Sequence, residues 1–425
     1  MKFFKLLVTL CLILLVSAAY PQEIKKTGGL ARLAGMGANP YVMDPFFNTV
    51  NPAWNGVYNN FILGDLGSNA GAPFSAGGFG QYLSASFQLG EDWTLGGILA
   101  RDDFNGISIA LLDPGDNYFF GLPNYSGVVS AVNGISGETN VIPLDNNVEA
   151  IGTYSFGNST VGLGVAYAST SNDVNPPTGG SSEGSASQIG FNLGLLTDLT
   201  KSVKLDLGGS LVLPSASFKQ DTLNETAANQ TIILVNARAF WDLNSKLKFV
   251  PLAAFATSSG TIDSGGTSTA SVDMTSLTWF AFGAGLNYQV GDFLLAGGVI
   301  FSSASETIPA ISDVSPERSN SITSFPVWNI GAEWNMLDWF VARLGYVTYS
   351  ANATSESTAT PTSVTEQTVS FFAPSQRGAT VGVGFRFGTF SLDCTVNEDV
   401  LRQGFNTIGG GGATFAYLTA SYSLP

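Results

Sequence analysis

Hydrophobic and polar residues alternate with period two along much of the chain. In Val203–Leu207 and Val235–Trp241, apolar side chains take every second position, and most positions between them are polar or charged. Such alternation is typical of a β-strand with one apolar and one polar face. The charged residues on the polar face of these and four further segments are Lys204, Asp206, Arg238, Glu333, Arg343, Arg386 and Asp393.

Short and long connections between these predicted strands alternate along the chain. Short connections fall at Gly90–Asp92, Gly157–Asn158, Asp198–Ser202, Leu243–Lys246, Gly291, Met336–Asp338 and Gly388–Thr389. Long loops rich in Ser, Thr, Gly and Asn are expected near 102–146, 171–186, 214–229, 259–272, 304–323, 351–376 and 398–412. Outer-membrane barrels show this asymmetry, with short periplasmic turns and long external loops. The pattern gives sixteen candidate strands from Val57 to Leu424, with both barrel ends on the periplasmic side.

The alternation alone also fits a soluble β-sandwich, and the composition separates the two. Charged residues make up only 12% of the chain, aromatic residues another 12%, and Gly accounts for 50 of 425 residues, which is unusual for a soluble domain. After residue 19, however, no stretch reaches the roughly 18 apolar residues of a membrane-spanning helix. A membrane protein without such helices satisfies its backbone in lipid as a closed β-barrel. We therefore predict an all-β fold, a transmembrane antiparallel β-barrel of 14–16 strands.

The first nineteen residues form a predicted signal peptide. Lys2 and Lys5 precede the apolar run Leu6–Val16, and Ser17–Ala19 supplies small residues for cleavage. The run is shorter than the roughly 20 residues of an anchor helix. Together with the barrel, this predicts location in a bacterial outer membrane. Cys394 is then the single cysteine of the mature chain, so no intramolecular disulfide is expected.

Tryptophan placement agrees with this topology. Trp93, Trp241, Trp334 and Trp339 each lie within three residues of a short connection. An aromatic girdle at the periplasmic rim of a barrel requires such clustering, whereas tryptophans of a soluble core do not.

Charge and missing residue types exclude several function classes. The chain has 17 basic and 32 acidic residues; removal of Lys2 and Lys5 leaves 15 against 32, a net charge of -17, which disfavours nucleic acid as a partner. It contains no histidine, which excludes His-dependent nucleophilic catalysis and His-ligated metal sites. Asp263, Asp273 and Asp313 offer oxygen ligands for calcium but lie outside any calcium-loop motif. We predict no enzymatic activity, no catalytic residue, no metal and no cofactor.

The segment before the first strand resembles a known family. It reads Gly28–Ala38 with the small-residue run Gly35-Met36-Gly37, then Asp44-Pro45, then Val50–Trp54 with the motif Asn51-Pro52-Ala53. This is similar to the N-terminal stretch of the FadL superfamily of outer-membrane barrels. The resemblance covers about 30 residues of this chain. The chain departs from the family at Asn39-Pro40, and its sixteen candidate strands exceed the family's fourteen.

The same segment has a physical interpretation as a plug inside the barrel. A wide barrel leaks unless something fills its lumen, and a Gly- and Ala-rich chain packs closely against the wall. We expect the plug residues Gly35, Met36, Gly37, Asp44, Asn51, Pro52 and Ala53 to lie in the lumen, and Lys25, Lys26 or Arg32 to pair with acids such as Asp206 or Glu333. The predicted units are thus 1–19 signal peptide, 20–56 plug and 57–425 barrel. A disordered periplasmic leader is the alternative for the second unit.

Two functions remain open. By resemblance, FadL-type barrels carry hydrophobic small molecules, of fatty-acid or hydrocarbon type, by passive diffusion through an external pocket, a mobile plug and an opening in the wall. Phe119, Phe120, Leu122 and Tyr125 are candidates for that ligand pocket. Some members of the superfamily resemble PorV, a component of type IX secretion, so a secreted protein is the alternative partner. A general porin is a third possibility that a genuine plug disfavours. Each of the three contacts outer-membrane lipids.

Overall fold

The structure is a computed structural model that describes residues 27–67, 80–101, 127–136, 141–144, 146–177, 180–221, 223–265, 270–310, 316–359, 363–372, 378–396 and 415–425. The predicted signal peptide, Lys25, Lys26 and the four candidate pocket residues Phe119, Phe120, Leu122 and Tyr125 lie outside this part of the chain.

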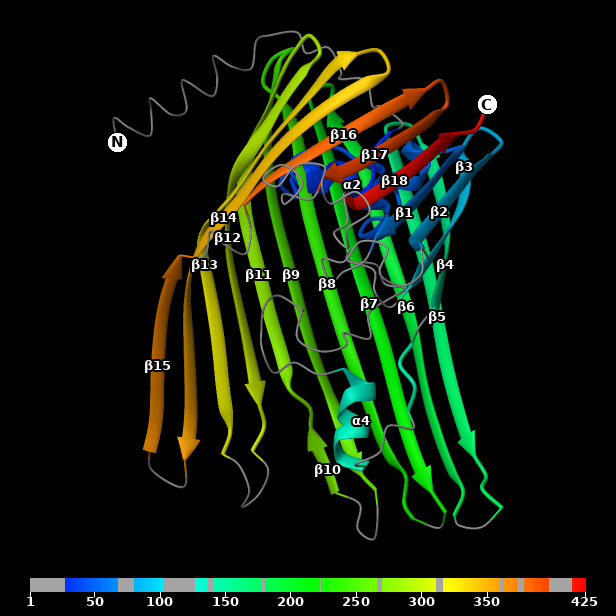
Figure 1. The fold of residues 1–425 in the computed structure, drawn as a ribbon, viewed down its shortest axis with the longest axis vertical. Coiled ribbons are helices and arrows are strands. Elements are labelled where there is room, and N and C mark those ends of the chain that lie inside the picture. The colour runs from blue at the N-terminus through cyan, green and yellow to red at the C-terminus, as the bar shows by residue number, and fades with distance from the viewer. Residues whose placement is uncertain are drawn as a thin grey trace, which may run out of the picture.

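The strands form one closed antiparallel sheet (Figure 1). They are β1 (Phe61–Gly67), β2 (Gly80–Leu89), β3 (Trp93–Arg101), β4 (Asn146–Phe156), β5 (Ser159–Val174), β6 (Ser182–Thr200), β7 (Val203–Gln220), β8 (Thr226–Asp242), β9 (Leu247–Ser264), β10 (Ala270–Asp273), β11 (Ser276–Val290), β12 (Phe293–Ile308), β13 (Arg318–Leu337), β14 (Phe340–Ala359), β15 (Ser363–Phe372), β16 (Ala379–Phe387), β17 (Phe390–Val396) and β18 (Phe415–Ser423). Consecutive strands pair along the chain, and β18 closes the ring on β1.

Eighteen strand elements fill sixteen positions around the barrel. Both β10 and β11 pair with β9, one after the other, and in the same way β15 and β16 both pair with β14. Each of these two pairs therefore occupies one position in the wall. The predicted barrel of 14–16 strands is confirmed at its upper limit.

Four helices accompany the barrel within the described residues: α2 (Leu30–Gly35), the 3-10 helix η2 (Pro45–Thr49), α3 (Trp54–Val57) and α4 (Val128–Ser136). In that part of the chain, no helix is both long and apolar enough to cross a membrane. The first three precede β1, and α4 lies between β3 and β4 and contacts the inner side of β7, β8 and β9. Val57, expected to open the first strand, is instead the last residue of α3, because Trp54 is buried and holds this turn against the wall.

All seven short connections expected from the sequence are short turns between strands. Gly90, Gly157, Gly291 and Gly388 take positive φ angles of 71°, 54°, 55° and 64°, a conformation that glycine adopts without steric cost. These turns lie at the same end of the barrel as the C-terminus, at the top of Figure 1.

The predicted long loops are largely wrong. Five of the segments, near 171–186, 214–229, 259–272, 304–323 and 351–376, consist mostly of strand, so that β5 to β14 continue well beyond the membrane-length strands on the other side of the barrel. Their Ser and Thr residues still alternate in and out and pair across strands, as between Ser185 and Ser217 at 3.1 Å and between Ser187 and Ser215 at 2.9 Å. Side chains with hydroxyl groups therefore pair across neighbouring strands in segments where we expected irregular loops.

An apolar band surrounds the outside of the barrel. On β6, Ile189, Phe191, Leu193 and Leu199 face outward and are exposed, while Gln188 and Asn192 face the lumen and are buried. Towards the long hairpins the outward positions change from apolar to hydroxyl-bearing side chains, from Tyr167 to Ser169 on β5 and from Ile233 to Thr231 on β8. Trp93, Trp334 and Trp339 are exposed at the opposite rim. An apolar band with an aromatic rim is the surface that a barrel presents to lipid.

Candidate functional site

Residues 27–60 cross the lumen and form a plug near the end with the short turns (Figure 1). Helix α2 contacts β14, β16, β17 and β18, whereas α3 contacts β2 to β5 on the opposite side. Local polar contacts shape the segment: Asp44 caps η2 by accepting from the Phe46 N–H, and Asn51 accepts from the Ala53 N–H across Pro52. The small residues and these turns let a short segment span the lumen.

Inward-facing glycines form the seat of the plug. A Cβ built on Gly162 would lie 2.5 Å from the Ala53 nitrogen, and one on Gly331 would lie 2.5 Å from the Met36 oxygen. Side chains at these positions would therefore displace the plug backbone. The plug meets further glycines at Gly194, Gly208, Gly285, Gly345 and Gly382.

A ladder of alternating charges ties α2 to one side of the wall. Arg32 pairs with Asp44 of the plug at 3.0 Å and with Glu333 of β13 at 2.8 Å. The pairs continue from Glu333 to Arg343 at 2.7 Å, from Arg343 to Asp393 at 2.7 Å, and from Asp393 to Arg386 at 2.8 Å. We call Asp44, Arg32, Glu333, Arg343, Asp393 and Arg386 the ionic ladder. Because buried charges are stable only when paired, its members hold one another in place.

A second anchor lies on the opposite wall, at Asp206 of β7. Arg238 donates to its carboxylate at 2.6 Å, Asn51 donates at 2.6 Å and the Trp54 indole donates at 3.1 Å. Arg238 also donates to the Pro40 carbonyl at 2.9 Å. Two residues of the Asn51–Trp54 motif thus bind one lumen acid directly.

Asparagine side chains clamp the backbone of the plug between these anchors. Asn236 donates to the Val50 carbonyl at 3.2 Å, Asn287 to the Tyr41 carbonyl at 2.7 Å and Asn329 to the Gly37 carbonyl at 2.8 Å. We did not single these residues out from the sequence. Their signal was available, because each is a lone polar residue between apolar residues that face lipid, as in Trp328-Asn329-Ile330.

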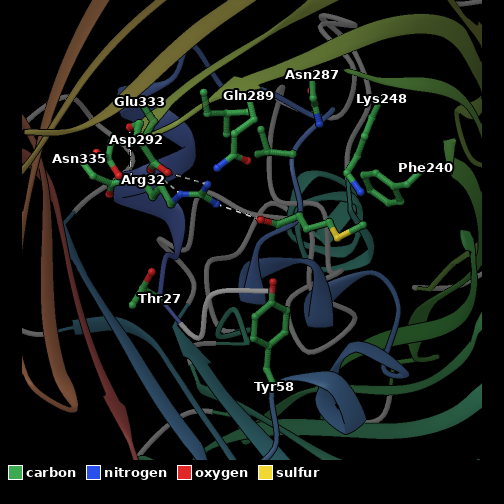
Figure 2. A pocket seen from close by; sticks show the side chains of 13 residues that line it. Thr27, Arg32, Tyr58, Phe240, Lys248, Asn287, Gln289, Asp292, Glu333 and Asn335 are labelled. Atoms are coloured by element: carbon green, nitrogen blue, oxygen red, sulfur yellow. Dashed lines mark hydrogen bonds and ion pairs between the residues drawn. The ribbon is translucent and has the colours of Figure 1, made fainter. Parts of the chain in front are cut away.

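A pocket of about 180 Å³ opens between the plug and the wall at the end with the short turns. Figure 2 shows Arg32 and Glu333 bonded at one side of it, with Tyr58 and Phe240 at the other. Lys248 lines the pocket as well but pairs with Asp242 at 2.6 Å, so both cations at this place are already neutralised.

Beyond the plug, towards the long hairpins, the inner wall is mainly apolar. Ile98, Val212, Ile232, Leu234 and Ala256 face inward, are buried and belong to one cluster with Trp54 and Tyr41 of the plug. A second apolar cluster follows, where Val128, Val129 and Val132 of α4 pack on the wall. The lumen thus differs from a water-filled porin channel, whose inner face is polar.

The structure places the predicted site residues as follows. The plug residues Gly35, Met36, Gly37, Asp44, Asn51, Pro52 and Ala53 all lie in the lumen, and all seven are buried. Asp206 and Arg238 form the second anchor, and Glu333, Arg343, Asp393 and Arg386 belong to the ionic ladder. Lys204 pairs instead with Asp198 at 2.6 Å, next to the turn at residues 201–202, and does not reach the plug.

A closed antiparallel barrel with an apolar outer band and a plug in its lumen defines the class. The chain is a bacterial outer-membrane β-barrel protein. No model of a known protein family matches its sequence, and neither does any curated protein.

Several solved structures are similar to the chain. They include a FadL homologue from Pseudomonas aeruginosa (11% identity, TM-score 0.40, 92% of this chain and 97% of the other covered) and the toluene transporter TodX from Pseudomonas putida (9%, 0.36, 96% and 100%). A third is the outer-membrane transporter YddB from Escherichia coli (11%, 0.37), of which 59% is covered by 79% of this chain. At these identities the likeness extends to the barrel fold alone.

Proposed function

We propose that this protein lets hydrophobic small molecules, of fatty-acid or hydrocarbon type, cross the outer membrane by passive diffusion. The observation that carries the proposal is the apolar inner wall beyond the plug, formed by residues such as Ile98, Val212 and Ile232. An apolar molecule leaves water favourably on reaching such a wall, by about 25 cal/mol per Å² of buried surface. Diffusion down a gradient needs no catalytic step and no cofactor.

The plug favours this function over that of a general porin. Its two anchors and the glycine seat bring its backbone into contact with strands all around the lumen. Small hydrophilic solutes therefore have no wide aqueous path while the plug stays in place. An opening in the wall, as in FadL-type barrels, remains part of the proposal.

The alternative of a PorV-like protein-binding barrel rested on the superfamily resemblance and on loops rich in small polar residues. Five of those segments consist mostly of strand, which weakens the second support, and the segments near 102–146 and 398–412 lie largely outside the described residues.

Two measurements on the full-length protein in detergent and in liposomes test the proposal. Native mass spectrometry should find octane or decanol retained by the barrel, whereas liposomes that contain the protein should not swell in isosmotic glucose. Ile232→Asn should reduce retention because this side chain faces the lumen. Ile233→Asn, on the opposite face of the same strand, is the matched control and should leave retention unchanged. Rapid swelling in glucose, or equal retention by both variants, would contradict the proposal.

A further inference from the structure

One acid on the inner wall has no basic partner. Glu149 of β4 is 0% exposed, and no arginine or lysine of the described residues pairs with it; its polar neighbour is the Asn192 amide. Other buried acids of the wall are paired: Asp206, Glu333 and Asp393 with arginine, Asp65 with Thr419 and Glu306 with Asn320. A buried charge without a partner is costly, so its presence calls for an explanation.

Asn192 of β6 lies beside this carboxyl. Ser210 donates to Asn192 Oδ1 at 3.1 Å, and the amide Nδ2 of Asn192 faces the Glu149 carboxyl. Gly164, on the strand between them, provides the space: a Cβ built there would collide with Glu149 Oε1 and lie 3.3 Å from the Asn192 Cβ. The two side chains therefore converge over one glycine, where an amide but no cation faces the buried carboxyl.

The pair lies directly beyond the plug. The next inward positions towards the short turns, Gly162 and Gly194, hold Ala53 and Asn51 of the plug. In the other direction, Ala168 and Ala186 belong to the cluster beneath α4. Glu149 and Asn192 thus occupy the wall between plug and α4, which is the region that the proposed transport function assigns to the ligand.

Apart from Ser210, which is bonded to Asn192, several side chains around the pair are apolar. Ile98 and Ile151 face inward on the strands around Glu149, and Ala166 and Val212 lie on the neighbouring strands at the same level. A ligand at this place would bury a hydrocarbon part against these side chains and present a polar end to the carboxyl.

We propose that Glu149 and Asn192 bind the cationic amine end of an amphipathic molecule, while the apolar wall takes its hydrocarbon chain. An ammonium group donates up to three hydrogen bonds and supplies the positive charge that would pair with the carboxylate. A fatty-acid anion would instead meet a like charge. This proposal rests on the proposed function, whose ligands it narrows to alkylamines ahead of alkanoates.

The test measures binding of decylamine, decanol and decanoate to the full-length protein in detergent by titration calorimetry. We expect decylamine to bind about tenfold more tightly than decanol, because a hydrogen bond to a charged partner is the stronger one. Decanoate should bind most weakly. Glu149→Gln keeps the shape of the side chain and should remove the advantage of decylamine while leaving decanol unchanged. Glu183→Gln, which alters an exposed acid at the outer end of β6, is the matched control and should change nothing.

Each contrary result identifies what fails. Decanoate that binds as tightly as decylamine, or an unchanged preference in Glu149→Gln, overturns the amine site but not the transport function. If none of the three molecules binds, the proposed ligand region itself is wrong. Should Glu149→Gln fail to fold, wild-type competition decides: decylamine must displace bound decanol, and decanoate must not.

Discussion

Outward residues on a barrel strand lie at different depths in the membrane, and on β6 the effect of this difference can be measured. Leu193 and Leu199 both face outward and are 61% and 59% exposed, but Leu193 lies in the middle of the apolar band and Leu199 at its rim. We expect Leu193→Arg to lower the free energy of unfolding by about 2–4 kcal/mol and Leu199→Arg by about 0–1 kcal/mol. Denaturant titration of both variants in lipid vesicles checks this. Equal losses would mean that the band is placed wrongly.

The ionic ladder gives a second test at single residues. Arg32→Met removes the bond from plug to Glu333 and leaves Asp44 without its cation, although Glu333 keeps Arg343. Breaking such a buried pair costs about 3–5 kcal/mol. Here most of that loss should fall on the free energy that holds the plug against the wall. Planar-bilayer recordings should show flickering openings.

Arg386→Met is the control for this change. It removes a charge from the far end of the same ladder, where Asp393 keeps Arg343 and no plug residue is involved. The control should stay as quiet as the wild type, and flickering in both variants would show that the ladder stabilises the wall rather than the plug.

The sequence allowed the lumen charges to be predicted but not their pairing. Alternation was sufficient to place Glu333, Arg343 and Asp393 on the inner face, since period two is a local property. Which acid meets which base depends on strand register and on the path of the plug, both of which are set by contacts far apart in the chain. Glu149 shows the same limit, because only the positions of Gly164 and Asn192 in the fold reveal that the acid faces an amide and no arginine.

At the scale of elements, the plug is the part whose removal should change function without unfolding the barrel. Deletion of residues 28–53 leaves every strand pairing in place, since the ladders begin at Phe61. The full-length protein should be nearly closed in a planar bilayer, and the deletion variant should show a large, steady conductance. An open full-length pore, or no change on deletion, would exclude the plug as the barrier.

Turns were easier to predict than loops for a physical reason. A tight turn needs glycine or another permissive residue at a fixed place, and Gly157, Gly291 and Gly388 mark theirs plainly. Segments rich in Ser and Thr have no comparable marker. In Ser185-Ala186-Ser187, the outward serines and the inward alanine are all small, so inward and outward positions look alike in the sequence although the strand continues.

For the whole molecule, closure of the sheet predicts how the protein behaves on a gel. Pairing of β1 with both β2 and β18 leaves no free edge in that part of the wall, so unfolding must break many ladder bonds together. The protein should remain folded in cold detergent, run faster than after boiling and show a β-rich circular dichroism spectrum. A helical spectrum, or a monodisperse protein without detergent, would contradict the barrel.

The apolar band also sets a thickness. On β6 it runs from Leu199 to Ile189, ten residue steps of about 3.3 Å each, or about 33 Å along the strand. With strands tilted by about 35–45°, its height is about 23–27 Å, less than the roughly 30 Å of an average bilayer core. Hydrophobic mismatch therefore favours thin membranes, and the unfolded protein should insert faster into vesicles of short-chain lipids than into those of long-chain lipids.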